Sequence, residues 1–366
     1  MRRALTHRPP AAAALAVLFC AGLAAPSPGL AARVHAATAA PTQHQTSAPP
    51  APPASMPPAA TPPALRLVVQ HAGGHPAFAI VGARIVVRGF LTPYAAGQKV
   101  KVTFYRDGRK LEVRLFGLAP RANGAGEFHV SFVSHDAGLV QARAVHYATQ
   151  ALPLLAAQSE KVRFTHTELA EGSRGASVQL LQSELSELRY SVPVNGVFEE
   201  ATGRAVLAFR KIAGMERVPY ANRRVFEALG RGMGSFHVRY RRDGRHVEAD
   251  LTRQVLAEIE PGGRVHAIYE MSSGKPSTPT VIGHFNVYSK TLGTNEKGMV
   301  DSNYFIRGYA IHGYPEVPIY AASHGCLRVP IPNAASIFAW VQIGTAVDVY
   351  NESGGGSHNV RGNVGP

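Results

Sequence analysis

Residues 310–328 read AIHGYPEVPIYAASHGCLR, and this segment sets the fold that we expect for the C-terminal part of the chain. His312 ends an apolar run of the kind that forms a β-strand, and Cys326 follows after a proline-bearing loop that can fold back. We therefore expect the imidazole and the thiol to meet at one end of a mostly β domain.

Cys326 carries the chemistry that this arrangement suggests. A nucleophilic thiol needs partial ionisation, a proton acceptor within hydrogen-bond reach, and donors for the oxyanion that forms on attack. We expect His312 to be the acceptor and, as an imidazolium, to lower the thiol pKa from its usual value of about 8.5. The carbonyl of Gly313 would orient the imidazole, and the backbone N–H groups of Gly325 and Cys326 would form the oxyanion hole.

The N-terminus has the layout of a signal peptide. Basic residues precede an uninterrupted, weakly apolar run at residues 11–25, which is shorter than the ~20 residues that a membrane-spanning helix requires. We place cleavage after residue 36, which lowers the formal net charge from +14 to +10 and removes Cys20, so that Cys326 is the only remaining thiol. We expect the mature protein in the periplasm, the cell wall or the extracellular space, with membrane contact only through the signal peptide.

The rest of the chain divides by composition. Its 366 residues exceed the usual size of one domain. Residues 37–64 are almost entirely Ala, Pro, Thr, Ser and Gln, which predicts an extended linker, and residues 352–366 are expected to be a flexible tail. The basic charge favours anionic wall polymers over nucleic acid, because no nucleic-acid module is present in the sequence. We expect a monomer.

Residues 65–165 are predicted to form an all-β sandwich. Val100, Val102 and Phe104 alternate with polar residues, a hairpin turn follows at residues 106–109, and residues 128–132 repeat the alternation. The region resembles the immunoglobulin-like domains of bacterial surface proteins.

Residues 166–233 are predicted to form a small three-helix domain. Apolar stripes at residues 178–188, 205–212 and 225–229 have helical spacing. The stripes and turn glycines resemble those of peptidoglycan-binding three-helix repeats. Asn195 stands where such repeats usually have Asp, so a helical packing domain without a ligand stays open as an alternative.

Residues 234–351 are predicted to form a mostly β domain with one covering helix. Strand-like runs are separated by turns such as residues 261–263, and the helix is expected to run from Asn333, as its N-cap, to about Val341. The fold class is therefore multidomain, with a β-sandwich, a three-helix domain and this mostly β domain.

The motif His-Gly followed by Ser-His-Gly-Cys-Leu-Arg resembles the active-site signature of the L,D-transpeptidases, which have a YkuD-type catalytic domain. The likeness covers residues 236–350 and includes a glycine- and proline-rich approach at residues 273–285. It implies a two-step acyl transfer on peptidoglycan stem peptides, without a metal or other cofactor. The cysteine attacks the peptide bond after the third residue of a tetrapeptide stem, releases D-alanine, and passes the acyl group to an amine of a neighbouring stem.

The resemblance assigns a role to each matching residue. Cys326 is the nucleophile, His312 is the base, and Gly313 supplies the carbonyl that orients the base. His324 and Gly325 belong to the loop that binds the oxyanion.

Four further side chains are candidates for supporting roles. Ser323 and Arg328 would position the loop, and Arg328 would also meet a substrate carboxylate. Tyr288 and Tyr304 would line the substrate pocket.

Three alternatives remain open. A zinc site would use His284, His312, His324 and Cys326, but the last two are only two residues apart and the usual paired-ligand spacings are absent. An L,D-carboxypeptidase would use the same thiol and pass the acyl group to water. A wall-binding protein without catalytic activity is the third, and the complete motif argues against it.

Overall fold

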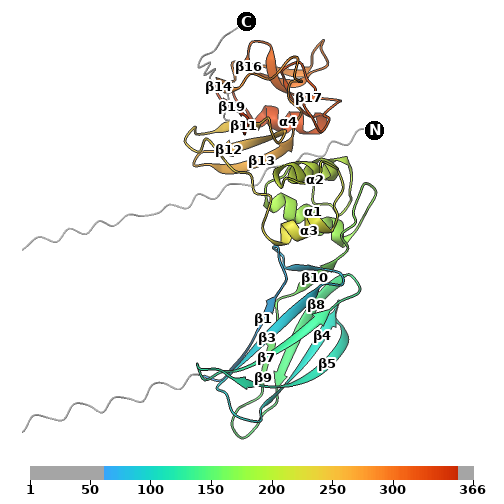
Figure 1. Ribbon diagram of the computed structural model, residues 1–366, viewed down its shortest axis with the longest axis vertical. Coiled ribbons are helices and arrows are strands. Elements are labelled where there is room, and N and C mark those ends of the chain that lie inside the picture. The colour runs from blue at the N-terminus through green and yellow to red at the C-terminus, as the bar shows by residue number, and fades with distance from the viewer. Residues whose placement is uncertain (1–61, 353–366) are drawn as a thin grey trace, which may run out of the picture. The chain divides into compact units, whose positions relative to one another are not determined.

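The structure is a computed structural model that describes residues 62–352 (Figure 1). The predicted signal peptide, nearly all of the predicted linker and the predicted tail beyond residue 352 lie outside the described residues. Within this described part, none of the helices combines the length and the apolar character needed to cross a membrane.

The first part is built from ten strands in two sheets. One sheet has the order β1-β3-β7-β6, and the other has the order β2-β10-β8-β4-β5 with β9 paired to β8. The strands are β1 (Ala64–Gln70), β2 (Phe78–Ile80), β3 (Arg84–Thr92), β4 (Lys99–Arg106), β5 (Arg109–Gly117), β6 (Ala119–Pro120), β7 (Gly126–Val133), β8 (Gly138–His146), β9 (Leu155–Gln158) and β10 (Val162–Thr165).

Both sheets contribute to one apolar core, as in a β-sandwich. Phe104 of β4 stacks on Phe132 of β7 with ring centroids 4.4 Å apart. The turn between β4 and β5 contains Asp107 and Gly108, which both have positive φ, at 49° and 82°. This backbone geometry matches a tight hairpin, so the predicted turn is confirmed. The likeness to immunoglobulin-like domains stays a prediction.

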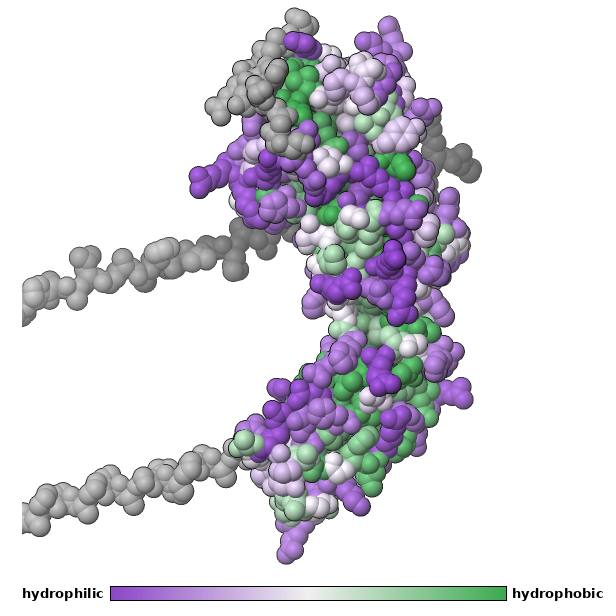
Figure 2. Space-filling view, in the orientation of Figure 1, coloured by the Kyte–Doolittle hydropathy of each residue, from purple (hydrophilic) through white to green (hydrophobic). Residues whose placement is uncertain are grey.

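The edge strand of the second sheet exposes apolar side chains. Leu111, Val113 and Leu115 of β5 are all exposed. Figure 2 shows hydrophobic surface on this part of the molecule.

Three helices follow, at the places that the apolar stripes predict. They are α1 (Ala176–Glu187), α2 (Glu200–Ile212) and α3 (Arg223–Gly230). Asn222 caps α3, since its side chain accepts a hydrogen bond from the N–H of Val225 at 3.4 Å. The helices are not packed only on one another, because their core continues into buried residues of the following sheet: Val255, Ala257, Ile259 and Ile268.

A buried ion pair lies at this junction. Lys211 of α2 has no exposed side-chain area, and its ammonium contacts Glu270 at 3.3 Å and the carbonyl of Gln254 at 3.0 Å. Arg204 binds the other oxygen of Glu270 at 2.9 Å. The helices and the C-terminal sheet therefore share both an apolar core and a charged contact.

The C-terminal part contains two sheets around a separate core. One has the order β13-β12-β11-β19-β14 and the other the order β15-β16-β17-β18. The strands are β11 (His246–Asp250), β12 (Val255–Glu260), β13 (Arg264–Glu270), β14 (Gly283–Asn286), β15 (Ser289–Thr294), β16 (Val300–Ile306), β17 (Tyr309–Tyr314), β18 (Leu327–Pro330) and β19 (Ala346–Tyr350). Side chains from both sheets and from the covering helix meet in this core.

The covering helix α4 (Ile331–Trp340) begins earlier than predicted. Pro330 occupies the N-cap position, and the prediction that Asn333 caps the helix is wrong. Asn333 lies inside the first turn, and its side-chain amide donates to the hydroxyl of Ser191 at 3.0 Å. A proline next to the helix start fits because the first turn does not use its N–H groups within the helix.

Candidate active site

His312 and Cys326 lie on the same face of the second sheet of the C-terminal part. Strands β17 and β18 are parallel, and their register pairs Ile311 with Leu327 and His312 with Arg328. Continuing this register places Cys326 next to Ala310, and alternate residues of a strand point to the same face. The return of the chain after the proline-bearing loop therefore brings the two side chains to one face.

Both side chains open onto one pocket of about 330 Å³. Its walls come from β17, from β18 and the segment before it, and from residues near the start of β16. The lining residues are Lys297, Met299, Gly308, Tyr309, His312, Tyr314, Ser323, His324, Cys326 and Arg328.

His312 is held as a neutral imidazole. Its side chain is buried, and its Nδ1 lies 2.9 Å from the carbonyl oxygen of Gly313. Because a carbonyl only accepts, Nδ1 carries the proton and Nε2 keeps a free lone pair. Burial, together with the positive charge of Arg328, lowers the pKa of His312 to about 4 although the Gly313 contact opposes the shift.

Cys326 is held as a neutral thiol. Burial raises its pKa above the usual value, and the backbone of Ala310 and the charges of Arg328 and Lys297 only partly offset this effect. The expected lowering by a neighbouring imidazolium is wrong for this state, since His312 is uncharged at neutral pH and is not among the groups that shift the thiol.

The thiol and the imidazole are not hydrogen-bonded in this structure. Among the contacts of the described residues, the sulfur of Cys326 donates only to the carbonyl of Gly308, at 3.8 Å. Catalytic hydrogen bonds are often long or absent before substrate binds. His312 and Cys326 therefore share a pocket without forming a pre-assembled pair.

Ser323 fixes the loop that precedes the thiol. Its hydroxyl donates to the carbonyl of Cys326 at 2.6 Å and accepts from the N–H of Gly325 at 3.0 Å. The prediction that the Gly325 N–H is a free oxyanion donor is therefore wrong in this conformation. Thr280 makes a further hydrogen bond to this loop, since its hydroxyl donates to the carbonyl of Gly325 at 2.8 Å.

Gly325 is required by both its backbone and its surroundings. Its φ is +118°, a conformation that side-chain-bearing residues rarely adopt. A Cβ at this position would lie 2.4 Å from the ring of Tyr309. The glycine thus allows the loop to pass directly under an aromatic ring of the pocket wall.

Basic groups surround the thiol. His324 is exposed, with its Nε2 3.2 Å from the ammonium of Lys275. Arg328 lies over the ring of Tyr314, 4.0 Å from its centroid, and Lys297 lines the same pocket. No Asp or Glu lines this pocket, so its electrostatic potential suits an anionic ligand.

The prediction that Tyr288 and Tyr304 line the pocket is wrong. The hydroxyl of Tyr288 donates to the carbonyl of Arg307, and that of Tyr304 accepts from Asn295 at 3.2 Å. These hydrogen bonds hold both rings at the β15–β16 edge. The sequence reasoning missed the two tyrosines that do line the pocket, Tyr309 and Tyr314, although both flank the motif histidine.

The alternative zinc site does not assemble at the thiol. His284 lies on β14, where its Nδ1 is 2.6 Å from the carboxylate of Asp348. His324 and Cys326 line the pocket described above, which His284 does not reach. His284, one of the four residues of the predicted zinc site, therefore belongs to a different cluster of side chains.

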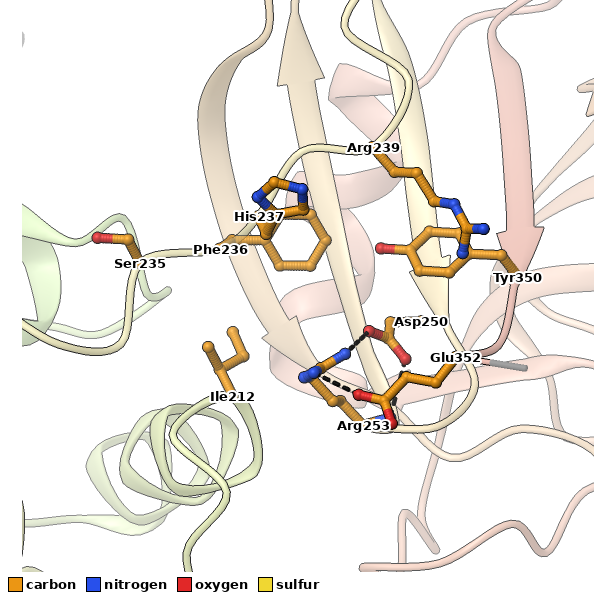
Figure 3. Close-up of a pocket in the computed structure, with 9 residues that line it drawn as sticks. All are labelled: Ile212, Ser235, Phe236, His237, Arg239, Asp250, Arg253, Tyr350 and Glu352. Atoms are coloured by element: carbon orange, nitrogen blue, oxygen red, sulfur yellow. Dashed lines mark hydrogen bonds and ion pairs between the residues drawn. The ribbon is translucent and has the colours of Figure 1, made fainter. Parts of the chain in front are cut away.

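A second, larger pocket of about 490 Å³ lies beside the segment that connects α3 to β11. Figure 3 shows Arg253 between the carboxylates of Asp250 and Glu352, with Arg239 beside Tyr350. Both carboxylates of this pocket are therefore already paired with Arg253. It contains none of the residues that the motif singles out, so size alone does not identify the functional site.

Comparisons with known proteins agree with the motif. The family model of the L,D-transpeptidase catalytic domain (YkuD) matches residues 244–349. No curated protein matches the chain.

Solved structures provide further relatives. An L,D-transpeptidase from Xylanimonas cellulosilytica is 35% identical, and the match covers 50% of this chain and 97% of that one with a TM-score of 0.46. An L,D-transpeptidase from Stackebrandtia nassauensis is 22% identical over 50% of this chain and 96% of that one, with a TM-score of 0.33. L,D-transpeptidase 3 from Mycobacterium tuberculosis, in complex with a faropenem-derived adduct, is 20% identical over 29% and 60% of the two chains, with a TM-score of 0.26.

The family model and the motif lead to one conclusion: residues 244–349 form an L,D-transpeptidase catalytic domain of the YkuD family.

Proposed function

We propose that this protein is an exported enzyme that cross-links peptidoglycan stem peptides, with Cys326 as the nucleophile and His312 as the general base. The observation that supports this most is that the thiol and the free imidazole nitrogen open onto one pocket with basic walls. Export rests on the predicted signal peptide.

Acylation begins from two neutral groups. As Sγ of Cys326 bonds to the carbonyl carbon after the third stem residue, the thiol proton moves to Nε2 of His312. The tetrahedral intermediate then expels D-alanine, whose nitrogen takes the proton from the imidazolium. The products are a thioester on Cys326, free D-alanine and a neutral His312.

Transfer repeats these steps with a different nucleophile. An amine of a neighbouring stem attacks the thioester, and His312 accepts a proton from the attacking nitrogen. The C–S bond breaks, and the departing sulfur takes a proton back from the imidazolium. The enzyme returns to its starting state with one new amide bond formed.

The thiol must change its hydrogen-bond partner during this cycle. Its contact with the carbonyl of Gly308 is long, at 3.8 Å, and therefore weak. Rotation of the Cys326 side chain away from that carbonyl, toward His312, would lose little energy. We infer that substrate binding favours the rotated position.

The basic walls support an anionic substrate. Lys297, His324 and Arg328 face the pocket, and Arg328 is held by its ring contact with Tyr314. Stem peptides carry free carboxylates, which pair well with a fixed guanidinium. Arg328 would thus hold a stem carboxylate while remaining close enough to keep His312 neutral.

The test uses the purified mature protein with a tetrapeptide stem and a labelled acceptor stem. We expect release of D-alanine and a labelled cross-linked product. Cys326→Ala should form no product while keeping the fold, as measured by circular dichroism. His312→Gln should lower the rate by about 10²- to 10⁴-fold. The same substitution at the exposed His135 of the β-sandwich is the matched control and should leave the rate unchanged.

The products separate the alternatives. Tripeptide and D-alanine without a cross-link would assign the protein as an L,D-carboxypeptidase. Substantial turnover by Cys326→Ala would reject the nucleophile assignment, and absence of D-alanine release from the unmodified protein would reject the enzymatic proposal.

A further inference from the structure

A second cluster of titratable side chains lies outside the thiol pocket, at the edge of the five-stranded sheet. Strands β14 and β19 are antiparallel, and their register places His284 opposite Asp348. Asp243 joins them from the turn before β11, where its N–H donates to the carbonyl of Tyr240 at 3.1 Å. One ligand atom from each of these three side chains lies within 4.8 Å of the others.

Asp348 is the unusual member of this cluster. Its side chain is 1% exposed, and one carboxylate oxygen accepts from His284, while Oδ2 has no partner among the described residues. A buried polar atom without a partner costs about 1–3 kcal/mol, and more when it is charged. Burial accordingly raises the pKa of Asp348 to about 6.

The neighbouring carboxylate of Glu248 shows that a buried carboxylate in this sheet can have hydrogen-bond partners for both of its oxygens. Glu248 of β11 is directly opposite Asp348 in the parallel register and is also fully buried. Both of its oxygens have partners: the backbone N–H groups of Arg239 and Tyr240, and the hydroxyl of Tyr350 at 3.1 Å. The unpartnered oxygen of Asp348 is thus not a general property of this sheet face.

The cluster opens onto a hollow of about 590 Å³. Asp243, His284 and Asp348 line it together with Tyr240, whose ring packs edge-on against the imidazole of His284 at a centroid distance of 4.8 Å. The imidazole is therefore held in place. Asp243 is exposed and free to turn toward the other two.

We propose that Asp243, His284 and Asp348 form a binding site for a divalent metal ion of the zinc class. Two carboxylates and one neutral imidazole give a net charge of −2, which a divalent cation balances. Three oxygen and nitrogen ligands with an open fourth position are typical of zinc.

The ligand spacing is compatible with this assignment once one side chain moves. Zinc lies about 2.0–2.2 Å from its oxygen and nitrogen ligands, so two ligand atoms of a tetrahedral site lie roughly 3.3–3.6 Å apart. The present spacing of up to 4.8 Å is wider than this, and binding requires rotation of the exposed Asp243 side chain toward the other two ligands.

The metal would join three parts of the chain. Asp243 belongs to the segment that leads from the helices to the catalytic domain, His284 belongs to β14, and Asp348 belongs to β19. A bound ion would hold this segment on the sheet. The site is separate from the thiol pocket, so the proposal goes beyond the transpeptidase reaction and does not depend on it.

The test is calorimetric titration of ZnCl₂ into metal-free protein. The Cys326→Ala background prevents binding of zinc to the thiol. We expect one ion per chain, and Asp348→Asn should weaken binding by at least about 100-fold, because it removes the buried charge without changing the shape. Asp136→Asn, an exposed Asp of the β-sandwich, is the matched control and should bind zinc as the parent protein does.

His284→Gln and Asp243→Asn keep the proposal testable if Asp348→Asn fails to fold, since both residues are partly or fully exposed. Each should weaken binding by about tenfold or more. A crystal soaked in zinc should show an anomalous peak within bonding distance of His284. No binding by the parent protein at millimolar zinc, or binding that all three variants retain, would overturn the proposal.

Discussion

The neutral state of His312 predicts activity at unusually low pH. A general base works only when unprotonated, and burial lowers the pKa of this residue to about 4 from an ordinary value of 6.5. At pH 5.5 an imidazole with the ordinary pKa would be about 9% neutral, whereas His312 would be about 97% neutral. Lowering the pH from 7.5 to 5.5 should therefore cost almost no activity, where an unperturbed histidine would lose about tenfold.

The assay is the second-order rate of acylation of Cys326 by a carbapenem, followed by intact-protein mass as a function of pH. This reaction needs no amine acceptor, so protonation of the acceptor does not affect it. The acid limb of the profile should be centred near pH 4. Arg328→Met is the informative variant, because removing its charge should move the limb to higher pH. A limb at pH 6.5 in the unmodified protein would refute the reasoning.

The same shift predicts how stability depends on pH. Because the unfolded chain binds a proton at His312 more readily than the folded chain, the free energy of unfolding should fall as the pH drops from 6.5 to 4. The loss from this residue amounts to at most about 3 kcal/mol, and none of it appears above pH 6.5. His312→Gln should remove this part of the dependence in urea unfolding measured at pH 4.5 and pH 7.

Three further predictions concern the loop, the junction and the thiol. Gly325→Ala should lower acylation by at least about tenfold without unfolding the protein, because its Cβ would meet Tyr309 and displace the loop; an unchanged rate would mean that the loop adapts. Lys211→Met should lower the free energy of unfolding by about 3 kcal/mol, since Glu270 would lose a buried partner, and Glu270→Gln in the same chain should restore part of it in urea unfolding. Alkylation of Cys326 by iodoacetamide should be slow at pH 7 and rise steadily to above pH 9, because burial raises the thiol pKa; a plateau near pH 7 would contradict this.

Local patterns predicted the helices, one hairpin and the mostly β character of the first and last parts of the chain. The turn at Asp107 and Gly108 and the three helices follow from turn residues and apolar spacing, which depend on neighbours in sequence. Strands β15, β16 and β18 were not predicted. β15 is mostly polar and exposed, and the pairing of β16 with β15 and with β17 is interrupted by register shifts, so neither strand shows a regular apolar alternation. The start of α4 was misplaced because Asn333 is used by a distant serine and not by its own helix.

The sequence predicted which residues form the site, but it did not predict their pKa values. The motif pointed to His312 and Cys326, but a sequence contains no burial, and burial sets both pKa values. The hydroxyl of Ser323 accepts a hydrogen bond from the N–H of Gly325, and the spacing of residues in the sequence does not predict this contact. His284 gave no signal of its cluster because Asp348 lies 64 residues away and becomes its neighbour only through strand pairing.

The most direct measurement is the mass of the acyl-enzyme. Purified protein is mixed with a tetrapeptide stem in the absence of an acceptor, quenched in acid within milliseconds to seconds, and digested for peptide mass analysis. We predict that the peptide containing Cys326 gains the mass of the tripeptide acyl group and that Cys326→Ala gains none. Release of D-alanine with no acyl group on Cys326, or with an acyl group on another residue, would contradict the account.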